Sequence, residues 1–154
     1  MSRESISDSD ADEDVLTLLM RASSGVAERI NAAVVDAGNP GLRPAHGLVF
    51  TCIAPHGATI NHIADRLGVT KQSAAAIVDG LERSGHVTRR PHPSDRRAWL
   101  IEPTSSGRQI MTVAAAALDR EMRSLRTAVG RRRAQDLREG LRHLAGAAKP
   151  RPVW

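Results

Sequence analysis

The residues from 71 to 84 combine helical spacing with side chains that suit the major groove of duplex DNA. At about 100° per residue, one side of this helix is apolar and should face a core; it consists of Ala74, Ile77, Val78 and Leu81. The opposite side carries small or neutral residues in its first half, among them Gln72 and Ala76. A glutamine amide can form two hydrogen bonds with an adenine edge, and an alanine methyl can contact a thymine methyl. The pattern therefore predicts a recognition helix, with an ordinary solvated helix as the alternative.

The start of this helix favours contacts with phosphate. Thr70 is the predicted N-cap, and Lys71 is the first helical residue. Unpaired backbone N–H groups and the positive end of the helix dipole make a helix N-terminus favourable for an anion. Contacts of this kind position a protein on DNA without reading its sequence. We therefore expect Thr70 and Lys71 to contact the DNA backbone.

A second candidate site is the basic turn Pro91-His92-Pro93-Ser94-Asp95-Arg96-Arg97. Arginine at a narrow hairpin tip is attracted by the negative potential of the minor groove, and Asp95 could brace a guanidinium through a bidentate pair. Residues 66–97 contain seven basic and three acidic side chains, which favours DNA over a neutral protein-contact surface. The alternative is a type I turn opened by Ser94-Asp95, whose arginines serve only solubility.

The elements around these residues predict a winged helix-turn-helix. A helix from about residue 60 to 67 has Thr59 as its N-cap and Gly68 at its C-terminus. A turn of about three residues then leads to the helix that starts at Lys71, which is the helix-turn-helix arrangement. Segments 86–90 and 98–102 have the composition of strands and flank the arginine-rich turn. A hairpin directly after a recognition helix is a wing.

Longer helical patterns lie on both sides of this unit. They cover about residues 12–37, 44–54, 104–129 and 131–147, with breaks at Gly38-Asn39-Pro40-Gly41, Pro55-His56-Gly57 and Gly130. A small winged domain cannot cover the apolar stripes of the first and last helices, but a second copy related by two-fold symmetry can. The predicted fold is mainly α with a small β-hairpin wing, and its dimerisation helices lie near both termini.

The formal net charge of +5 combines two unlike parts. Residues 1–15 contain six acidic side chains and one basic side chain, whereas the remaining residues contain 21 basic and 11 acidic ones. We expect the acidic segment to be a disordered, solubilising tail; the alternative is an arm that competes with DNA phosphate for the basic surface. The basic body favours duplex phosphate or another anion as its partner.

Composition argues against several classes of protein. Phe50, Trp99 and Trp154 are the only aromatic residues, which is few for a protein that stacks unpaired bases. No apolar run approaches the roughly 18 residues of a membrane span, and no secretory signal is visible. The single Cys52 fits a reducing compartment, so we expect a cytoplasmic protein without membrane contact. Because no Gly-rich phosphate loop, HExxH or GxSxG motif occurs, we expect neither an enzyme nor a cofactor.

Four segments taken together resemble the MarR family of bacterial transcriptional regulators. They are Gly68-Val69-Thr70-Lys71-Gln72-Ser73, Leu81-Glu82-Arg83-Ser84-Gly85-His86-Val87-Thr88-Arg89, Pro93-Ser94-Asp95-Arg96-Arg97-Ala98 and Pro103-Thr104-Ser105-Ser106-Gly107. The resemblance covers residues 13–147 in order and spacing. Pro103 departs from the family pattern, which usually has leucine before the threonine; we expect this to affect only local strand pairing.

The resemblance implies a homodimer that binds a pseudo-palindromic operator in double-stranded DNA, with function as a repressor. It assigns major-groove contacts to Thr70, Lys71, Gln72, Ser73 and Ala76. It assigns a minor-groove contact to Arg97, with Asp95 as the brace, and we expect the neighbouring Arg96 to contact DNA as well. The domains expected on this basis are an acidic disordered tail (1–11), a helical dimerisation region (12–40 and 104–147), a winged helix-turn-helix DNA-binding domain (41–103) and a loose tail (148–154).

The resemblance also implies that a small phenolic or carboxylate effector relieves DNA binding. A cleft for it is predicted near Arg21, His46 and Phe50, although scarce aromatic residues leave little for a flat ligand to stack on. Alternatives within the same fold are a redox-responsive or a metal-responsive regulator. Cys52 has no flanking cation and is expected to be a buried, inert thiol, and the six histidines lack convincing metal-ligand spacing, so no metal is expected. A winged-helix module for protein contacts is a further alternative.

Overall fold

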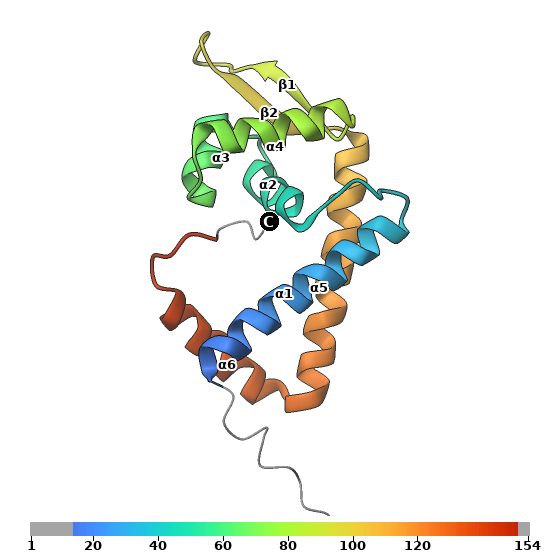
Figure 1. Cartoon of the computed structure of the whole chain (residues 1–154), viewed down its shortest axis with the longest axis vertical. Coiled ribbons are helices and arrows are strands. Elements are labelled where there is room, and N and C mark those ends of the chain that lie inside the picture. Colours follow the sequence, from blue (N-terminus) through green and yellow to red (C-terminus); the bar gives the residue numbers. More distant parts are fainter. Residues whose placement is uncertain (1–13, 151–154) are drawn as a thin grey trace, which may run out of the picture.

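A computed structural model of the chain describes residues 14–150 (Figure 1). The elements in chain order are α1 (Val15–Asp36), α2 (Pro44–Ile53), α3 (Ile60–Leu67), α4 (Lys71–Arg83), β1 (Val87–Pro91), β2 (Trp99–Pro103), α5 (Ser105–Val129) and α6 (Arg131–Ala145). The mainly helical fold with a small hairpin is thus confirmed. The acidic tail predicted for residues 1–11 lies outside the described residues, as do the last four residues of the predicted C-terminal tail.

Local capping signals explain why the central helices begin and end where they do. Thr59, Thr70 and Thr104 are the N-caps of α3, α4 and α5, and the side chain of each accepts a hydrogen bond from a backbone N–H three residues further on. Gly68 ends α3 in the left-handed conformation (φ 63°), which costs little for a residue without Cβ. These caps hold α3 and α4 at the short turn that the sequence predicts.

The wing is an antiparallel pair of strands, β1 and β2, displaced by one residue from the predicted segments. Val87 pairs with Pro103, Arg89 with Ile101, and Pro91 with Trp99. Each strand ends at a proline, which supplies no backbone N–H to continue the ladder. Ile101 also exchanges two backbone hydrogen bonds with Ala58, at 3.1 and 2.8 Å. This bridge attaches the wing to the segment between α2 and α3.

We call α2, α3, α4 and the wing the winged head. The largest fully buried side chains of the structure lie within it: Val49, Ile53, Ile63, Leu67, Val78, Leu81 and Ile101. The same core is joined by Val34 from α1 and Ile110 from α5. The head therefore folds around one continuous apolar core, which fixes the position of α4 and the base of the wing.

We call α1, α5 and α6 the arms. In Figure 1, α5 extends from the wing to the opposite end of the molecule, α1 crosses it, and α6 turns back below α1. The Arg29 guanidinium of α1 pairs with the Glu121 carboxylate of α5 at 2.8 Å. No residue of α6 is buried. Within residues 14–150, each helix is too short or too polar to cross a lipid bilayer.

Candidate nucleic-acid interface and ligand cavity

The α4 helix presents one apolar and one solvent-exposed face. Ala74, Ile77, Val78 and Leu81 are buried, as the helical spacing predicts. Lys71, Gln72 and Ala76 are exposed on the surface of the head. The side that the sequence assigns to DNA is therefore open to solvent along the first turns of α4.

Two of the predicted DNA contacts, Thr70 and Ser73, also form the N-terminal cap of α4. The Thr70 hydroxyl oxygen accepts a hydrogen bond from the Ser73 backbone N–H at 3.1 Å and lies 2.8 Å from the Ser73 hydroxyl oxygen. Thr70 is exposed and Ser73 is partly exposed. The two hydroxyl groups thus lie together beside the N-terminus of α4, where its unpaired N–H groups favour an anion.

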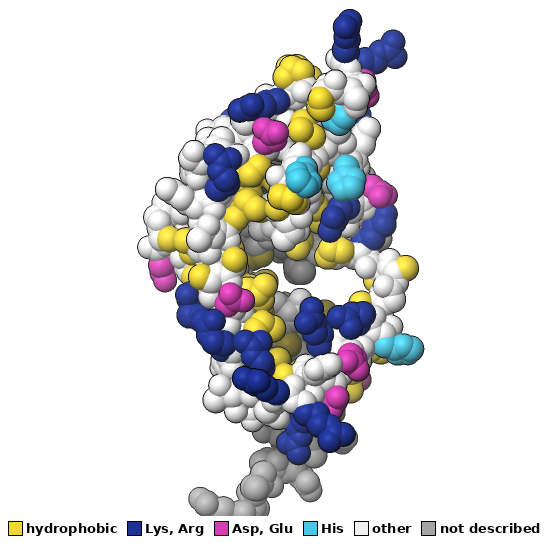
Figure 2. Space-filling view, turned by 180° about the vertical axis from the view of Figure 1, so that it is seen from behind, with side chains coloured by type: hydrophobic (Ala, Val, Ile, Leu, Met, Phe, Trp, Pro, Cys, Tyr) yellow, Lys and Arg dark blue, Asp and Glu magenta, His cyan; other side chains and the backbone are white. Residues whose placement is uncertain are grey.

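The tip of the wing presents two arginines to solvent. Arg96 and Arg97 are exposed, and neither forms an ion pair with another residue of the described part of the chain. In Figure 2, Lys or Arg side chains project from one end of the molecule. Unpaired, solvated guanidinium groups at a protruding tip are available for a phosphate or a minor groove.

Asp95 acts on this tip differently from the sequence-based prediction. Its carboxylate accepts a hydrogen bond from the Arg97 backbone N–H at 2.9 Å, and its carbonyl accepts one from the Ala98 N–H at 3.0 Å. No bidentate pair between Asp95 and a guanidinium is present in residues 14–150. A short polar side chain bonds readily to the backbone two residues on, so Asp95 fixes the turn that presents the arginines and leaves their charges free.

Sequence reasoning missed the ion pairs that connect the wing to α4. The Arg89 guanidinium of β1 pairs with Asp79 of α4 and lies 3.4 Å from the Glu82 carboxylate. Arg90 pairs with Glu102 across the wing at 3.2 Å. Two of the seven basic residues counted between 66 and 97 are therefore compensated within the head. The available signal was the acidic pair at 79 and 82, because residues three apart share a helix face.

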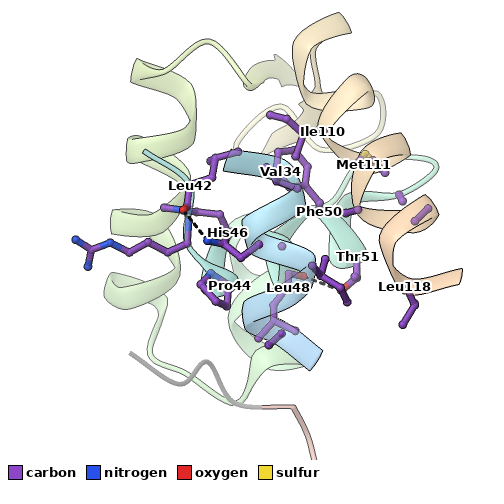
Figure 3. Close-up of a pocket in the computed structure, with 18 residues that line it drawn as sticks. Val34, Leu42, Pro44, His46, Leu48, Phe50, Thr51, Ile110, Met111 and Leu118 are labelled. Carbon is purple, nitrogen blue, oxygen red and sulfur yellow. Dashed lines mark hydrogen bonds between the residues drawn. The ribbon is translucent and has the colours of Figure 1, made fainter. Parts of the chain in front are cut away.

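A cavity of about 410 Å³ lies where α1, α2 and α5 meet (Figure 3). His46 and Phe50 line it, as predicted for an effector site, whereas Arg21 does not. Arg21 lies on α1 six positions before Ala27, which is the first residue of the chain to reach the cavity. The remaining wall is mostly aliphatic: Ala27, Ile30, Val34, Leu42, Leu48, Ala54, Ile110, Met111, Ala114, Ala115 and Leu118.

The protonation state of His46 follows from its surroundings. Its Nδ1 accepts a hydrogen bond from the Arg43 backbone N–H at 2.9 Å. Burial lowers the pKa of His46, and electrostatic repulsion from the nearby Arg43 and His86 lowers it further. The imidazole is therefore neutral near pH 7, and because Nδ1 is an acceptor, the ring proton is on Nε2.

Cys52 is buried on the inner side of α2. Burial raises the pKa of its thiol, so the reactive thiolate is disfavoured at neutral pH. Among residues 14–150, no three His, Cys, Asp or Glu side chains are grouped so that they could hold a metal ion.

Comparison with known proteins relates these features to a family. The family model described as "MarR family" matches residues 41–98. The chain is 40% identical over 53 residues to the HTH-type transcriptional repressor YetL of Bacillus subtilis and 35% identical over 60 residues to the transcriptional activatory protein BadR of Rhodopseudomonas palustris. These matches cover 34% and 39% of this chain, and the chain spans only about a third of the length of each relative (32% and 34%).

Solved structures match nearly the whole chain. CouR from Rhodococcus jostii RHA1 bound to p-coumaroyl-CoA has a TM-score of 0.71 and 28% identity, and the match covers 97% of this chain and 100% of that one. CouR bound to a 23-mer DNA duplex has a TM-score of 0.70 and 26% identity, with 94% and 99% covered. The likeness therefore includes the arms as well as the winged head.

Proposed function

We propose that this chain, which belongs to the MarR family by its central domain and its fold, is a homodimeric repressor of transcription. It would bind a pseudo-palindromic DNA site. One observation carries the proposal. The exposed side of α4 and the unpaired arginines of the wing both belong to the head, whose core holds them in a fixed relation. A duplex offers a groove to each feature, since the small and neutral side of α4 suits the major groove and the arginines of the tip suit the minor groove.

Within this proposal, the first turns of α4 enter the major groove. Gln72 and Ala76 would read base edges, while Thr70, Lys71 and Ser73 would contact phosphate and neighbouring groups. Arg96 and Arg97 would reach the minor groove or its phosphates, positioned by the turn that Asp95 fixes. Pairing with Arg89 supports this assignment, because it compensates two acidic side chains of α4 that would otherwise repel phosphate.

The arms would form the dimer. Large apolar side chains are exposed on all three of them: Val15, Leu16, Leu18, Met20, Leu118, Leu137, Leu141 and Leu144. Exposed apolar surface of this extent marks an interaction site, and two-fold symmetry buries the same surface on both subunits. We therefore propose residues 12–40 and 104–147 as the dimerisation region and residues 41–103 as the DNA-binding domain.

A small-molecule effector would bind in the cavity between the arms and the head and weaken DNA binding. CouR, named above with both DNA and p-coumaroyl-CoA, supports an effector, and YetL supports repression. The structure offers a route from the cavity to α4. Leu42 and His46 also border a second hollow, whose other wall includes Gly80, Leu81, Arg83 and Ser84 at the end of α4. A ligand that displaces Leu42 or His46 would therefore press on the recognition helix.

Selection of bound sequences from random duplexes, with the full chain, tests the proposal. We expect enrichment of a two-fold symmetric site whose half-sites lie about one helical turn, roughly 10 bp, apart. The double variant Arg96→Ala/Arg97→Ala should enrich the same sites poorly, whereas the matched variant Arg131→Ala/Arg132→Ala in α6 should behave as the wild type. Absence of enrichment would contradict DNA recognition, and enrichment of a single unpaired half-site would contradict the dimer.

A further inference from the structure

Most polar groups that line the 410 Å³ cavity are already engaged with the protein. The Asn31 side-chain amide donates to the Leu42 carbonyl oxygen at 3.2 Å, and the Thr51 hydroxyl donates to the Leu48 carbonyl oxygen at 2.7 Å. Phe50 is the one aromatic residue of the lining. A ligand would therefore meet an aliphatic wall with little aromatic surface for stacking and few polar groups to satisfy.

The cationic side chain and the histidine of the lining, Arg43 and His46, lie together at one end of the cavity. Arg43 lines the cavity, its side chain is exposed, and it makes no ion pair within residues 14–150. His46 offers its Nε2 N–H, because Nδ1 is occupied by the Arg43 backbone N–H. Figure 3 shows Leu42, Pro44 and His46 on one side and Thr51, Met111 and Leu118 on the other.

The cavity therefore differs in polarity between its two ends. A cation and a neutral N–H donor lie at the N-terminal end of α2, and the rest of the wall continues along Phe50, Ile110 and Met111 as apolar surface. A carboxylate accepts from both kinds of donor, and its pairing with arginine is among the stronger hydrogen-bonded contacts. Because the Arg43 side chain is exposed, the carboxylate would stay partly hydrated and would avoid the full cost of burying a charge.

The volume of the cavity limits the size of a ligand. At the roughly 30 Å³ that one water molecule occupies in the liquid, 410 Å³ holds about a dozen non-hydrogen atoms. An unbranched carboxylate of about ten carbons has this size. A flat aromatic acid would find only Phe50 to stack on, so its ring would gain less from the wall than a flexible chain that can follow it.

We propose that the cavity binds a medium-chain aliphatic carboxylate, with its head group at Arg43 and His46 and its chain against Val34, Phe50, Ile110 and Met111. The inference rests on the proposed function, since it names the class of effector that acts at this site. It differs from the phenolic ligand that the sequence resemblance implies, because it makes the head group and the aliphatic wall the determinants of specificity.

Isothermal titration of the full chain at pH 7.5 with three probes of similar size tests the proposal. The probes are decanoate, 1-decanol and 4-hydroxycinnamate, which separate the contribution of the charge from that of the chain. We expect decanoate to bind at least about ten-fold more tightly than either of the other probes, because one hydrogen bond to a charged group contributes about this much to affinity. Equal or tighter binding of 1-decanol would overturn the head-group assignment, and tighter binding of 4-hydroxycinnamate would overturn the aliphatic one. No binding of decanoate would overturn both.

A pair of variants locates the head group. Arg43→Gln keeps the backbone N–H that His46 needs, and it should weaken decanoate about ten-fold while 1-decanol is unchanged. Arg126→Gln removes a charge that is also exposed, from α5 and outside the cavity, and should change the affinity for neither ligand. Unchanged decanoate affinity in Arg43→Gln would refute the assignment of Arg43. Circular dichroism of each variant checks folding, and the comparison of probes on the wild type needs no variant.

DNA binding is measured separately, by fluorescence anisotropy with a selected duplex and no added ligand. DNA binding without decanoate binding would overturn this inference and leave the proposed function intact. Decanoate binding without DNA binding would support the ligand assignment and overturn the proposed function. If the chain binds both the duplex and decanoate, decanoate should release the duplex, whereas 1-decanol at the same concentration should release less of it.

Discussion

The winged head and the arms differ in how they bury apolar side chains. The largest fully buried residues all lie between positions 49 and 101, within the head. Among residues 14–150, the arms instead contribute eight of the nine large exposed apolar residues; the ninth, Trp99, is on the wing. The head thus contains most of the core, to which the arms add Val34 and Ile110, whereas the arms also have an apolar surface that a second copy would complete. The comparison indicates that the fold of the head and the assembly of the arms can be disturbed independently.

The junction between the two regions is tightly packed. The Thr104 hydroxyl donates to the Gly85 carbonyl oxygen at 2.7 Å at the start of α5. At Gly107 a Cβ atom would lie 2.1 Å from the carbonyl oxygen of His86, so this position of α5 has no room for a side chain. A junction of this kind transmits the geometry of the arms to the head. In a dimer, the arms would therefore set the spacing of the two recognition helices.

The largest expected effect comes from the core of the head. Leu67→Ala removes a fully buried side chain and should lower the free energy of unfolding by about 2–5 kcal/mol. Urea unfolding at two protein concentrations measures it, and the loss should be similar at both. Leu144→Ala, at an arm residue that is 66% exposed, is the control and should cost much less in the dissociated chain. A larger loss for Leu144→Ala would contradict the comparison of the two regions.

A smaller, concentration-dependent effect should come from the arms. Leu141→Asp replaces an exposed apolar residue of α6 by a charge. If a partner copy covers this residue, each leucine contributes about 1.5–3 kcal/mol to association, so the variant should shift the population toward monomer. Sedimentation equilibrium measures the shift. His143→Asp places the same charge two residues further along α6 and should have little effect; equal dissociation in both variants would argue against an apolar interface at Leu141.

The sequence predicts much of the head, because its signals are local. Thr59 and Thr70 cap helices as predicted, Thr104 lies at the predicted start of α5, and the apolar spacing of α4 correctly identifies its buried face. A cap needs only the residue and the N–H groups that follow it. Helical spacing likewise depends only on neighbours along the chain. These features can therefore be predicted without knowing how the elements pack against one another.

Features that depend on how elements meet were predicted less well. Arg89 reaches Asp79 only because β1 lies beside α4. Asp95 was assigned a guanidinium as its partner, although its bond to the Arg97 backbone N–H is a local contact that its residue type favours. The wing strands are displaced by one residue from their predicted bounds. His46 and Phe50 line the cavity while Arg21 does not, since the crossing of α1 over α2 and α5 decides which turns of α1 reach it. The pairing of Arg89 and the lining of the cavity follow from how the elements pack, which local spacing along the sequence does not determine.

The surface of the head gives the next prediction. Arg97→Ala should weaken binding of a selected duplex by about 1–3 kcal/mol if this side chain makes a specific contact. Arg90→Ala is the matched control, because Arg90 belongs to the same wing but its guanidinium is paired with Glu102. Anisotropy titrations at matched salt compare the two. A loss as large for Arg90 as for Arg97 would mean that wing charge in general, and not the tip, determines affinity.

Gln72 and Lys71 separate sequence reading from backbone attraction on α4. Gln72→Ala should relax base preference at one symmetric pair of positions, at a cost of about 1–3 kcal/mol on the preferred duplex. Lys71→Ala should instead weaken all duplexes alike and reduce the slope of log K against log salt by about one. Binding to the preferred and a scrambled duplex measures both effects. An equal loss on the two duplexes for Gln72→Ala would refute base reading by this residue.

The smallest effect should come from the boundary between head and arms, at His46. Burial, with Arg43 and His86 nearby, holds the pKa of His46 below its ordinary value of about 6.5. Above that value the ring is neutral in both states and contributes no pH dependence. As the pH falls below it, the unfolded chain takes up a proton that the folded chain resists, so stability decreases until the folded pKa is passed. His46→Gln should flatten the fall in melting temperature between about pH 7.5 and about pH 5, whereas His143→Gln, on the exposed surface of α6, should keep it. An unaltered pH profile in His46→Gln would show that the head and arms meet at this point without any penalty for a charged imidazole.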